Sequence, residues 1–184
     1  MTRRRLGRVI AALAAAIGLF VVFELGYERT AAFRQGNRLY YRDGRATGAG
    51  IVFGRFWTFL SRFGLTPPVI VSLETIGSRS GRRRAIPMVI ARYEGHDHLV
   101  AMLGERSPWV HNVRAAGGQP WLRRGHLRAV NLVEVPVADR APIIRAYLRV
   151  AAGARPRIRV ATDAPIEAFE AVAGAHPVFR IDAA

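Results

Sequence analysis

The sequence predicts an α+β fold, in which antiparallel strands form a small barrel or a highly curved sheet with helices at its flanks. Short runs rich in Val, Ile and Leu are joined by turn signals typical of β-hairpins. A helical pattern interrupts these hairpins once, and further helical patterns come only near the end of the chain. The chain has neither an internal repeat nor the alternation of strands and helices that a Rossmann domain requires.

Length and composition allow one well-buried core. The chain has 184 residues and is 51% hydrophobic, which suits a single globular domain with additional segments. We therefore divide it into an N-terminal signal-anchor or transmembrane helix (1–27), a basic linker with an amphipathic helix (28–66) and a barrel domain that binds a cofactor (67–184).

The first 27 residues have the pattern of a signal sequence or a membrane anchor. An uncharged, Ala-rich run over residues 9–23 follows a leader rich in arginine, which also resembles a twin-arginine export signal. Fifteen helical residues reach about 22 Å, short of a hydrocarbon core of about 30 Å, and an extension to Tyr27 includes Glu24. No small-x-small cleavage site follows Phe23. We expect a single retained anchor at the cell membrane, in contact with membrane lipid; a buried core helix is the alternative.

Arginines lie on both sides of this apolar run, so the membrane side that faces the barrel stays open. Residues 29–50 are then polar and rich in Gly and Arg, which is typical of a linker. Residues 51–63 predict a basic amphipathic helix. It could lie on a membrane surface, cover an apolar pocket or pack on the domain core. Its apolar face carries Phe53, Phe56, Trp57, Leu60 and Phe63.

Pro67 and Pro68 end that helix and open a region rich in β-forming residues. Hairpin turns are expected at Glu94–Asp97 and at Arg124–Gly125, where the apolar runs are interrupted. The expected strands are residues 69–75, 86–93, 98–103, 121–123, 126–137 and 177–182.

Three helices are expected between and after these strands, at residues 107–116, 139–150 and 164–173. Ser107 is the expected N-cap of the first helix, with Pro108 in its first turn. Asp139 and Asp163 are the expected capping residues of the other two.

The chain is strongly basic and has no cysteine. Its formal charge is +15, and every one of its 28 basic residues is Arg, which implies attraction to nucleic acid, acidic lipid or an anionic small molecule. The lack of cysteine excludes disulfides, thiolate nucleophiles and Cys-ligated metals. Only His96 and His98 are close together among the five histidines, and we expect no metal site there.

The turn between the first two expected strands has the composition of an anion-binding site. Gly77 and Gly81 permit tight or left-handed backbone, so that successive N–H groups can converge on one ligand. Hydroxyl groups of Ser78 and Ser80 add donors, and guanidinium groups bind phosphate or carboxylate at roughly 1.5–3 kcal/mol for each charge-assisted contact. A solvated basic loop is the alternative. The four arginines are Arg79, Arg82, Arg83 and Arg84.

Two motifs in this region resemble those of the deazaflavin-dependent nitroreductase family. The first is Leu73-Glu-Thr-x-Gly-x-Arg-Ser-Gly-x-x-Arg-x-x-Pro87, and the second is Gly104-x-x-x-x-Trp109-Val-x-Asn112-Val-Arg-Ala. The resemblance runs from about Pro67 to Ile181. It implies a split β-barrel that binds coenzyme F420, an 8-hydroxy-5-deazaflavin, and transfers hydride to a quinone, a nitroaromatic compound or a similar apolar acceptor. FMN is the alternative cofactor.

The resemblance also implies roles for residues of the first motif. Arg79, Ser80 and Arg84 would contact phosphate or carboxylate groups of the cofactor tail. Gly77 and Gly81 would let the backbone approach it closely. The strand that flanks the ring would begin at Pro87 and Met88.

Residues of the second motif would lie near the ring. Trp109 would pack there, with a core anchor as the alternative, and Asn112 would order the loop. His111 could donate a proton or a hydrogen bond to an acceptor oxygen, as a candidate catalytic residue, although a histidine on a helix surface is the simpler interpretation. Hydride transfer mainly requires stacking geometry and exclusion of water.

Two other classes of function are consistent with parts of the sequence. A nucleic-acid-binding module would explain the charge, but the chain has no such motif and begins with an apolar run, so no nucleic-acid partner is expected. A non-catalytic accessory subunit of a membrane complex, which keeps the barrel without turnover, is the main alternative. Assembly as a homodimer or within such a complex stays open.

Overall fold

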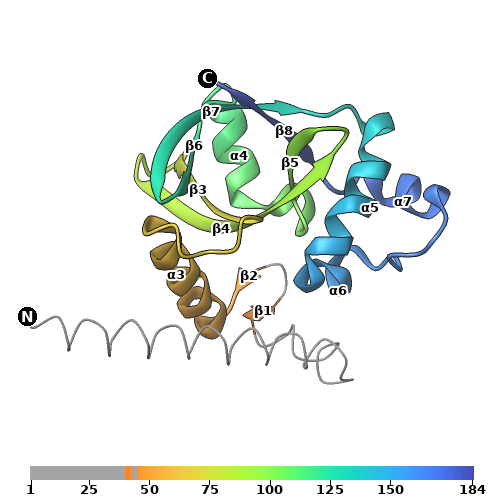
Figure 1. Ribbon diagram of the computed structural model, residues 1–184, viewed down its shortest axis with the longest axis horizontal. Helices are drawn as coiled ribbons and strands as arrows, with labels where there is room; N and C mark the ends of the chain where they lie inside the picture. Colours follow the sequence, from red (N-terminus) through yellow and green to blue (C-terminus); the bar gives the residue numbers. More distant parts are fainter. Residues whose placement is uncertain (1–39, 43–44) are drawn as a thin grey trace, which may run out of the picture. The chain divides into compact units, whose positions relative to one another are not determined.

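The computed structural model describes residues 40–42 and 45–184 of the chain (Figure 1). The predicted N-terminal anchor and most of the predicted linker lie outside the described residues. The described residues belong to one compact unit. Among the helices described, none combines the length and the apolar character needed to cross a membrane.

Six antiparallel strands close into a barrel, in the order β3-β4-β5-β8-β7-β6 (Figure 1). This confirms the predicted antiparallel barrel with flanking helices. Hairpins join β3 to β4, β4 to β5 and β6 to β7, and the last strand closes the barrel between β5 and β7. The strands are β3 (Ile70–Ile76), β4 (Arg83–Tyr93), β5 (His96–Val100), β6 (Trp121–Arg124), β7 (His126–Glu134) and β8 (Val178–Ala183).

Strand β4 begins three residues earlier than predicted. Its first residues pair with the end of β3, Arg83 with Ile76 and Arg84 with Thr75, so the ladder continues through two arginines that the sequence places in the turn. Strand β5 ends three residues earlier than predicted, because the chain turns at residues 101–103 into a 3-10 helix (Gly104–Arg106).

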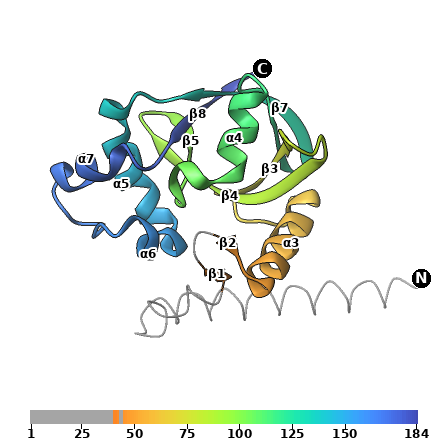
Figure 2. The same ribbon diagram turned by 180° about the vertical axis from the view of Figure 1, so that it is seen from behind.

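Helix α4 (Pro108–Ala115) contributes to the core inside the barrel, and Figure 2 shows it among the strands. Successive residues of a strand face opposite sides, so every second residue points inward. Leu73 and Leu99 are fully buried there, beside Trp109 and Val110 of α4. The remaining members of this inner core are Val71, Ile90, Ala101, Val113, Leu122, Val130, Leu132 and Phe179.

A second core lies on the outer side of β4, β5 and β8, where α5 (Arg140–Val150) and α7 (Ile166–Ala173) cover the barrel. Ala91, Val100 and Val178 face this side of the strands, and Ile144 and Phe169 pack on them. Where the helices cover them, these strands have two buried faces, which explains short apolar runs such as residues 88–91 of β4. A short helix, α6 (Arg155–Ile158), and 3-10 turns at Val137–Asp139 and Ala152–Ala154 complete this half.

Helix α3 (Gly48–Arg62) lies against the outer side of β3, β4 and β6, after a two-stranded ribbon of β1 (Tyr41–Arg42) and β2 (Arg45–Ala46) (Figure 1). The hydroxyl of Thr47 accepts a hydrogen bond from the Gly50 amide and caps the helix, which therefore begins before the predicted residue 51. Trp57 and Leu60 are buried as expected for core packing, but Phe63, predicted on the same face, is exposed.

The predicted helix caps differ from the structure. Ser107 and Asp139 occupy the N-cap positions of α4 and α5, yet neither side chain accepts a capping hydrogen bond. Asp139 has helical backbone because it ends a 3-10 turn, so its side chain is not set for a cap. Helix α7 begins after Pro165 and not at Asp163.

Candidate anion-binding turn and cofactor site

The β3–β4 turn, residues 77–82, is closed by hydrogen bonds within itself. The amide of Gly77 donates to the Arg82 carbonyl at 2.9 Å. The amides of Ser80 and Gly81 both donate to the Gly77 carbonyl, at 3.1 and 2.8 Å. Arg82 in turn donates its amide to the Ser80 hydroxyl oxygen at 3.4 Å. The turn is therefore a compact structure with a defined shape.

The turn requires glycine at two positions, for a different reason at each. A Cβ on Gly77 would come within 2.6 Å of the Ser80 hydroxyl oxygen and 3.4 Å of the Arg82 carbonyl oxygen. Gly81 has a φ of +60°, in the left-handed region that residues with side chains adopt at a cost. The first glycine keeps the turn tight, and the second lets it reverse direction.

Asn112 of α4 fixes this turn to the helix. Its side-chain oxygen accepts a hydrogen bond from the Ser78 amide at 3.0 Å, and its side-chain nitrogen donates to the Thr75 hydroxyl at 3.1 Å. Asn112 and Thr75 are both buried. This geometry is that of a loop-ordering residue. The role of Thr75 is not apparent from the sequence, although it lies within the first motif.

These contacts correct the prediction that the turn offers its backbone N–H groups to an anion. The amides of residues 77, 78, 80, 81 and 82 all have protein acceptors. Within the described part of the chain, the Arg79 amide alone in the turn lacks one. Anion recognition by this turn therefore falls to its side chains.

The turn arginines divide between the two faces of the hairpin. Arg84 pairs with Thr75, so its side chain leaves the strand on the face that carries the Asn112 contact. Arg79, Arg82 and Arg84 are exposed, and none of them forms an ion pair with any residue that the structure describes. Three cationic groups are thus available around one ordered turn, and the Ser80 hydroxyl is exposed beside them.

Arg83 points to the opposite face and is occupied. Its Nε lies 2.7 Å from a carboxylate oxygen of Glu74, and its guanidinium carbon lies 5.0 Å from the centre of the Trp121 ring. Arg123 of β6 binds the other carboxylate oxygen of Glu74 at 2.5 Å. Glu74 is 7% exposed, so two guanidinium groups compensate one buried carboxylate. A single Glu within an apolar strand was the signal for this cluster in the sequence.

Pro87 and Met88 are both half-buried but face opposite sides of β4. Met88 pairs with Val71 and packs against the inner core. Pro87 pairs with Ser72 on the outer side, where its ring lies 3.7 Å from the position of a Cβ built on Gly54 of α3. Strand alternation therefore allows only one of these two side chains to face a given ligand.

Trp109 and His111 differ in their surroundings on α4. Trp109 is 7% exposed and lies in the inner core, with its ring centre 5.3 Å from that of Phe179. Trp109 thus has the position of a core anchor, which is the alternative to packing near the cofactor ring. His111 is exposed on the helix surface.

Arg114 connects α4 to the 3-10 helix that precedes it and to β7. It donates two hydrogen bonds to Glu105 and two to Glu134 of β7, with distances from 2.7 to 3.0 Å. These hydrogen bonds lower the pKa of both carboxyl groups. Arg140 of α5 is buried, donates to Glu134 as well and binds the carbonyl of Val135. The helix that carries Asn112 is thereby held to the barrel by a charged network.

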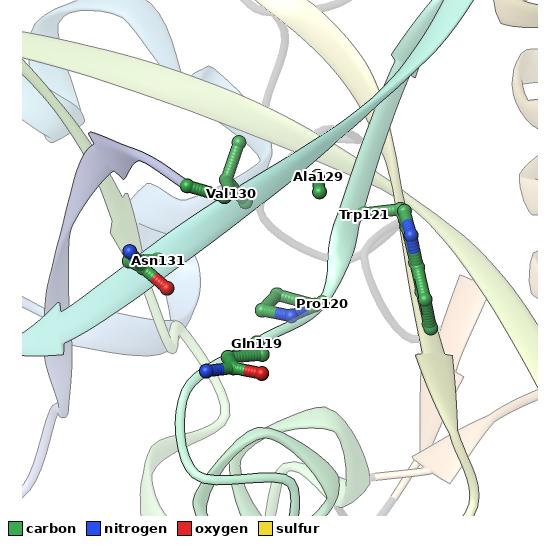
Figure 3. Close-up of a pocket in the computed structure, with 7 residues that line it drawn as sticks. Gln119, Pro120, Trp121, Ala129, Val130 and Asn131 are labelled. Atoms are coloured by element: carbon green, nitrogen blue, oxygen red, sulfur yellow. The ribbon is translucent and has the colours of Figure 1, made fainter.

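Two surface cavities lie outside the predicted cofactor residues. One, of about 260 Å³, is lined by residues 119–121 at the start of β6, by residues 129–131 in the middle of β7 and by Ala184 (Figure 3). The other, of about 310 Å³, lies between α3 and the outer side of the β3–β4 hairpin. No group of three or more His, Asp or Glu side chains that could hold a metal occurs in residues 40–42 and 45–184.

Comparisons with known proteins complete this description. Among solved structures, the chain is similar to an F420-H2-dependent reductase, with 22% identity and a TM-score of 0.39 over 62% of this chain and 95% of that one. It is also similar to a chain described as a domain-swapped dimer, with 18% identity and a TM-score of 0.46 over 70% and 92% of the two chains. An FAD-binding protein from Mesorhizobium loti shows 14% identity and a TM-score of 0.41 over 68% and 88%. No curated protein matches the chain.

A sequence match to a family covers more than half of the chain. The family of F420H(2)-dependent quinone reductases matches residues 60–168, which is 109 of 184 residues. The matched region includes the ordered turn, its three free arginines and Asn112. This match confirms the resemblance to deazaflavin-dependent reductases. The chain therefore belongs to the F420H(2)-dependent quinone reductase family, a family of oxidoreductases.

Proposed function

We propose that this protein transfers hydride from reduced coenzyme F420 to a quinone, at the cell membrane to which its N-terminal segment anchors it. One observation carries the proposal: Arg79, Arg82 and Arg84 are exposed and form no ion pair with the described residues, around a turn that Asn112 holds in place inside the region that matches the family. Coenzyme F420 carries a phosphodiester and a tail of carboxylates. Three free guanidinium groups suit such a polyanion.

The residues present fit the anionic part of the cofactor. The Arg79 amide and the Ser80 hydroxyl stand beside the three arginines as additional donors. Because Asn112 and the internal hydrogen bonds already order the turn, binding costs little further conformational entropy. When bound, the reduced deazaflavin supplies a hydride and a proton, which together convert a quinone to a quinol. FMN also carries a phosphate and is the control ligand for this assignment.

The protein contributes position and exclusion of water more than acid–base chemistry. Asn112 binds α4 to β3 through Thr75, Trp109 packs against Phe179 of β8, and Met88 faces the same inner side as Thr75. His111 is exposed and stays a candidate donor to an acceptor oxygen. Replacement by Ala tests it: an unchanged rate and pH profile would exclude His111 from the reaction.

The proposal is tested by titrating the purified full-length protein with reduced and oxidised F420, with FMN and NADPH as controls. Saturable binding of F420, followed by its oxidation on addition of a menaquinone analogue, is the expected result. Binding of FMN in place of F420 would change the cofactor assignment. Binding of neither, in a folded protein, would favour the accessory subunit without turnover.

Arginine variants locate the site within the same assay. We expect Arg79→Gln and Arg84→Gln each to raise the Kd for F420 about tenfold, because each removes one charge-assisted contact. Arg149→Gln is the matched control, since Arg149 is an exposed arginine on α5, away from the turn. Equal effects of all three substitutions would mean that only the overall charge of the protein matters.

A further inference from the structure

One face of α3 is exposed along the length of the helix and combines aromatic, aliphatic and cationic side chains. Val52 is 67% exposed, and Phe59 and Phe63 are 53% and 62% exposed. With Ile51, Arg55 and Arg62 they fall within an arc of about 120°, at about 100° per residue. Trp57 and Leu60 lie on the opposite arc and are buried against the barrel. An exposed apolar stripe of this kind marks an interaction surface.

The arginines of this face border the cavity between α3 and the β3–β4 hairpin. The cavity has a volume of about 310 Å³, and its lining includes Arg55, Arg62, Arg83 and Glu74. Glu74 is already compensated by Arg83 and Arg123. Arg55 and Arg62 therefore have no carboxylate partner within the described part of the chain, and the groove carries a net positive charge.

Phe59 belongs to both features. Its ring lines the groove and also packs edge-to-face on Phe63, with ring centres 5.1 Å apart. A ligand in the groove would thus have its anionic group at the arginines and its apolar part at the phenylalanines. A free inorganic anion would satisfy Arg55 and Arg62 but would leave the aromatic pair in water.

A surface of acidic lipid offers both kinds of contact at once. A basic amphipathic helix at such a surface places its apolar side chains at the acyl boundary and its cations among the headgroups. The charge of the chain is +15, and the apolar run at residues 9–23 lies only 25 residues before Gly48, where α3 begins. Both facts favour a lipid surface over a protein partner.

We propose that α3 docks on an acidic membrane surface, with lipid phosphates at Arg55 and Arg62 and with Phe59 and Phe63 in the acyl boundary. This inference rests on the membrane localisation proposed above and does not depend on the redox assignment. The docked helix touches β4 where Gly54 meets Pro87, so the hairpin that carries the arginine turn would lie at the membrane that holds an apolar acceptor.

The absence of cysteine makes a single-site label straightforward. In the full chain, Phe63→Cys carries an environment-sensitive fluorophore on α3. Val133→Cys, on β7 and 45% exposed in the native chain, carries the same label as a control. Both proteins are added to phosphatidylcholine vesicles with or without phosphatidylglycerol, and with a quencher attached to the acyl chains. We expect strong quenching at position 63 in acidic vesicles and little at position 133.

A charge variant tests the groove itself. Arg55→Gln with Arg62→Gln, in the Phe63→Cys background, should lower the ratio of docked to undocked α3 roughly 10- to 30-fold in acidic vesicles. Arg128→Gln with Arg149→Gln removes the same charge from exposed positions elsewhere and is the matched control. Equal losses in the two double variants would overturn the assignment of the groove.

The remaining outcomes separate this inference from the anchor. If the protein sediments with vesicles but position 63 is quenched no more than position 133, α3 does not dock and the anchor alone holds the protein. If the protein does not sediment at all, the membrane localisation fails as well. Without vesicles, the fluorescence of the label at position 63 could instead respond to rising protein concentration or to inorganic phosphate. Either response would assign this face to self-association or to a soluble anion and would overturn the lipid assignment.

Discussion

The side-chain oxygen of Asn112 accepts a hydrogen bond from the Ser78 amide at 3.0 Å, across a separation of 34 residues. This contact joins α4 to the arginine turn between β3 and β4. The same side chain donates to Thr75, so both ends of its amide are used. The position of three free arginines therefore depends on one buried amide group.

Replacement of Asn112 by Ala should loosen the turn and weaken anion binding. It removes two hydrogen bonds and leaves the Thr75 hydroxyl buried without that donor, at a cost of about 1–3 kcal/mol in the free energy of unfolding. Hydrogen exchange at the Ser78 amide should accelerate, and the Kd for F420 should rise. Chemical denaturation and amide exchange measure the two effects.

Asn112→Asp serves as the conservative control for that variant. A carboxylate can accept from the Ser78 amide, and the Thr75 hydroxyl can rotate to donate to it. We expect slow exchange at Ser78 to persist, while the added negative charge weakens F420 binding. Equal exchange rates in the Ala and Asp variants would contradict the role of Asn112 in ordering the turn.

Two glycine substitutions should differ in whether a second change rescues them. Gly77→Ala places a Cβ 2.6 Å from the Ser80 hydroxyl oxygen, which is a removable atom. We expect a loss of about 1–2 kcal/mol in stability, most of it recovered in the double variant with Ser80→Ala. A double-mutant cycle by urea unfolding measures the coupling.

Gly104→Ala is the contrasting case. Gly104 has a φ of +68°, and a Cβ there would meet the Ala175 carbonyl oxygen, which is backbone, at 2.6 Å. We expect a larger loss, about 2–4 kcal/mol, because both strain and a clash arise. Gly153→Ala, with no atom within 4 Å of the added Cβ, should be close to neutral. A Gly104→Ala protein as stable as Gly153→Ala would contradict this packing.

The sequence predicts the barrel well because most of its strands follow local rules. Apolar runs and Gly-containing turns such as Gly95 and Gly125 place the hairpins within a few residues. The closure of the barrel by β8 between β5 and β7 is a long-range pairing that no local pattern specifies. The resemblance of two motifs to a family implies a split β-barrel, but the strand order comes from the structure.

The composition of the site can be predicted from the sequence, but its geometry cannot. The sequence marks the arginines of the turn but does not show that Arg83 belongs to Glu74 while Arg84 stays free, since this depends on strand register. It also suggests that backbone amides bind the anion. These amides instead donate hydrogen bonds within the turn and to Asn112, so they are not available to an anion.

Glu74→Gln should destabilise the barrel on the side that α3 covers. The substitution removes the charge that compensates Arg83 and Arg123, of which Arg123 is largely buried. We expect a loss of about 1–3 kcal/mol, less than for a fully buried pair because Arg83 is half exposed. Denaturant unfolding measures it. Arg92→Gln, which breaks the exposed pair with Asp97, is the control and should leave the stability nearly unchanged.

Stability should fall in two separate steps as the pH is lowered. Burial lowers the pKa of His98, so the unfolded chain binds a proton there before the folded protein does. Its contribution is complete above the unfolded value of about 6.5 and is lost as the pH falls from there through the lower folded pKa. Hydrogen bonds from Arg114 lower the pKa of Glu105 and Glu134, so the stability that these carboxylates contribute is also lost as the pH falls.

The second step therefore begins near the ordinary glutamate pKa of about 4.3 and continues as the pH falls through the lowered pKa values of Glu105 and Glu134. Urea unfolding at pH values between 3 and 8 should resolve both steps. His98→Gln should remove the upper step because glutamine does not titrate, and Glu134→Gln should reduce the lower one. Loss of the upper step in the Glu134→Gln protein would contradict this assignment, because Glu134 should contribute only where carboxylates take up protons.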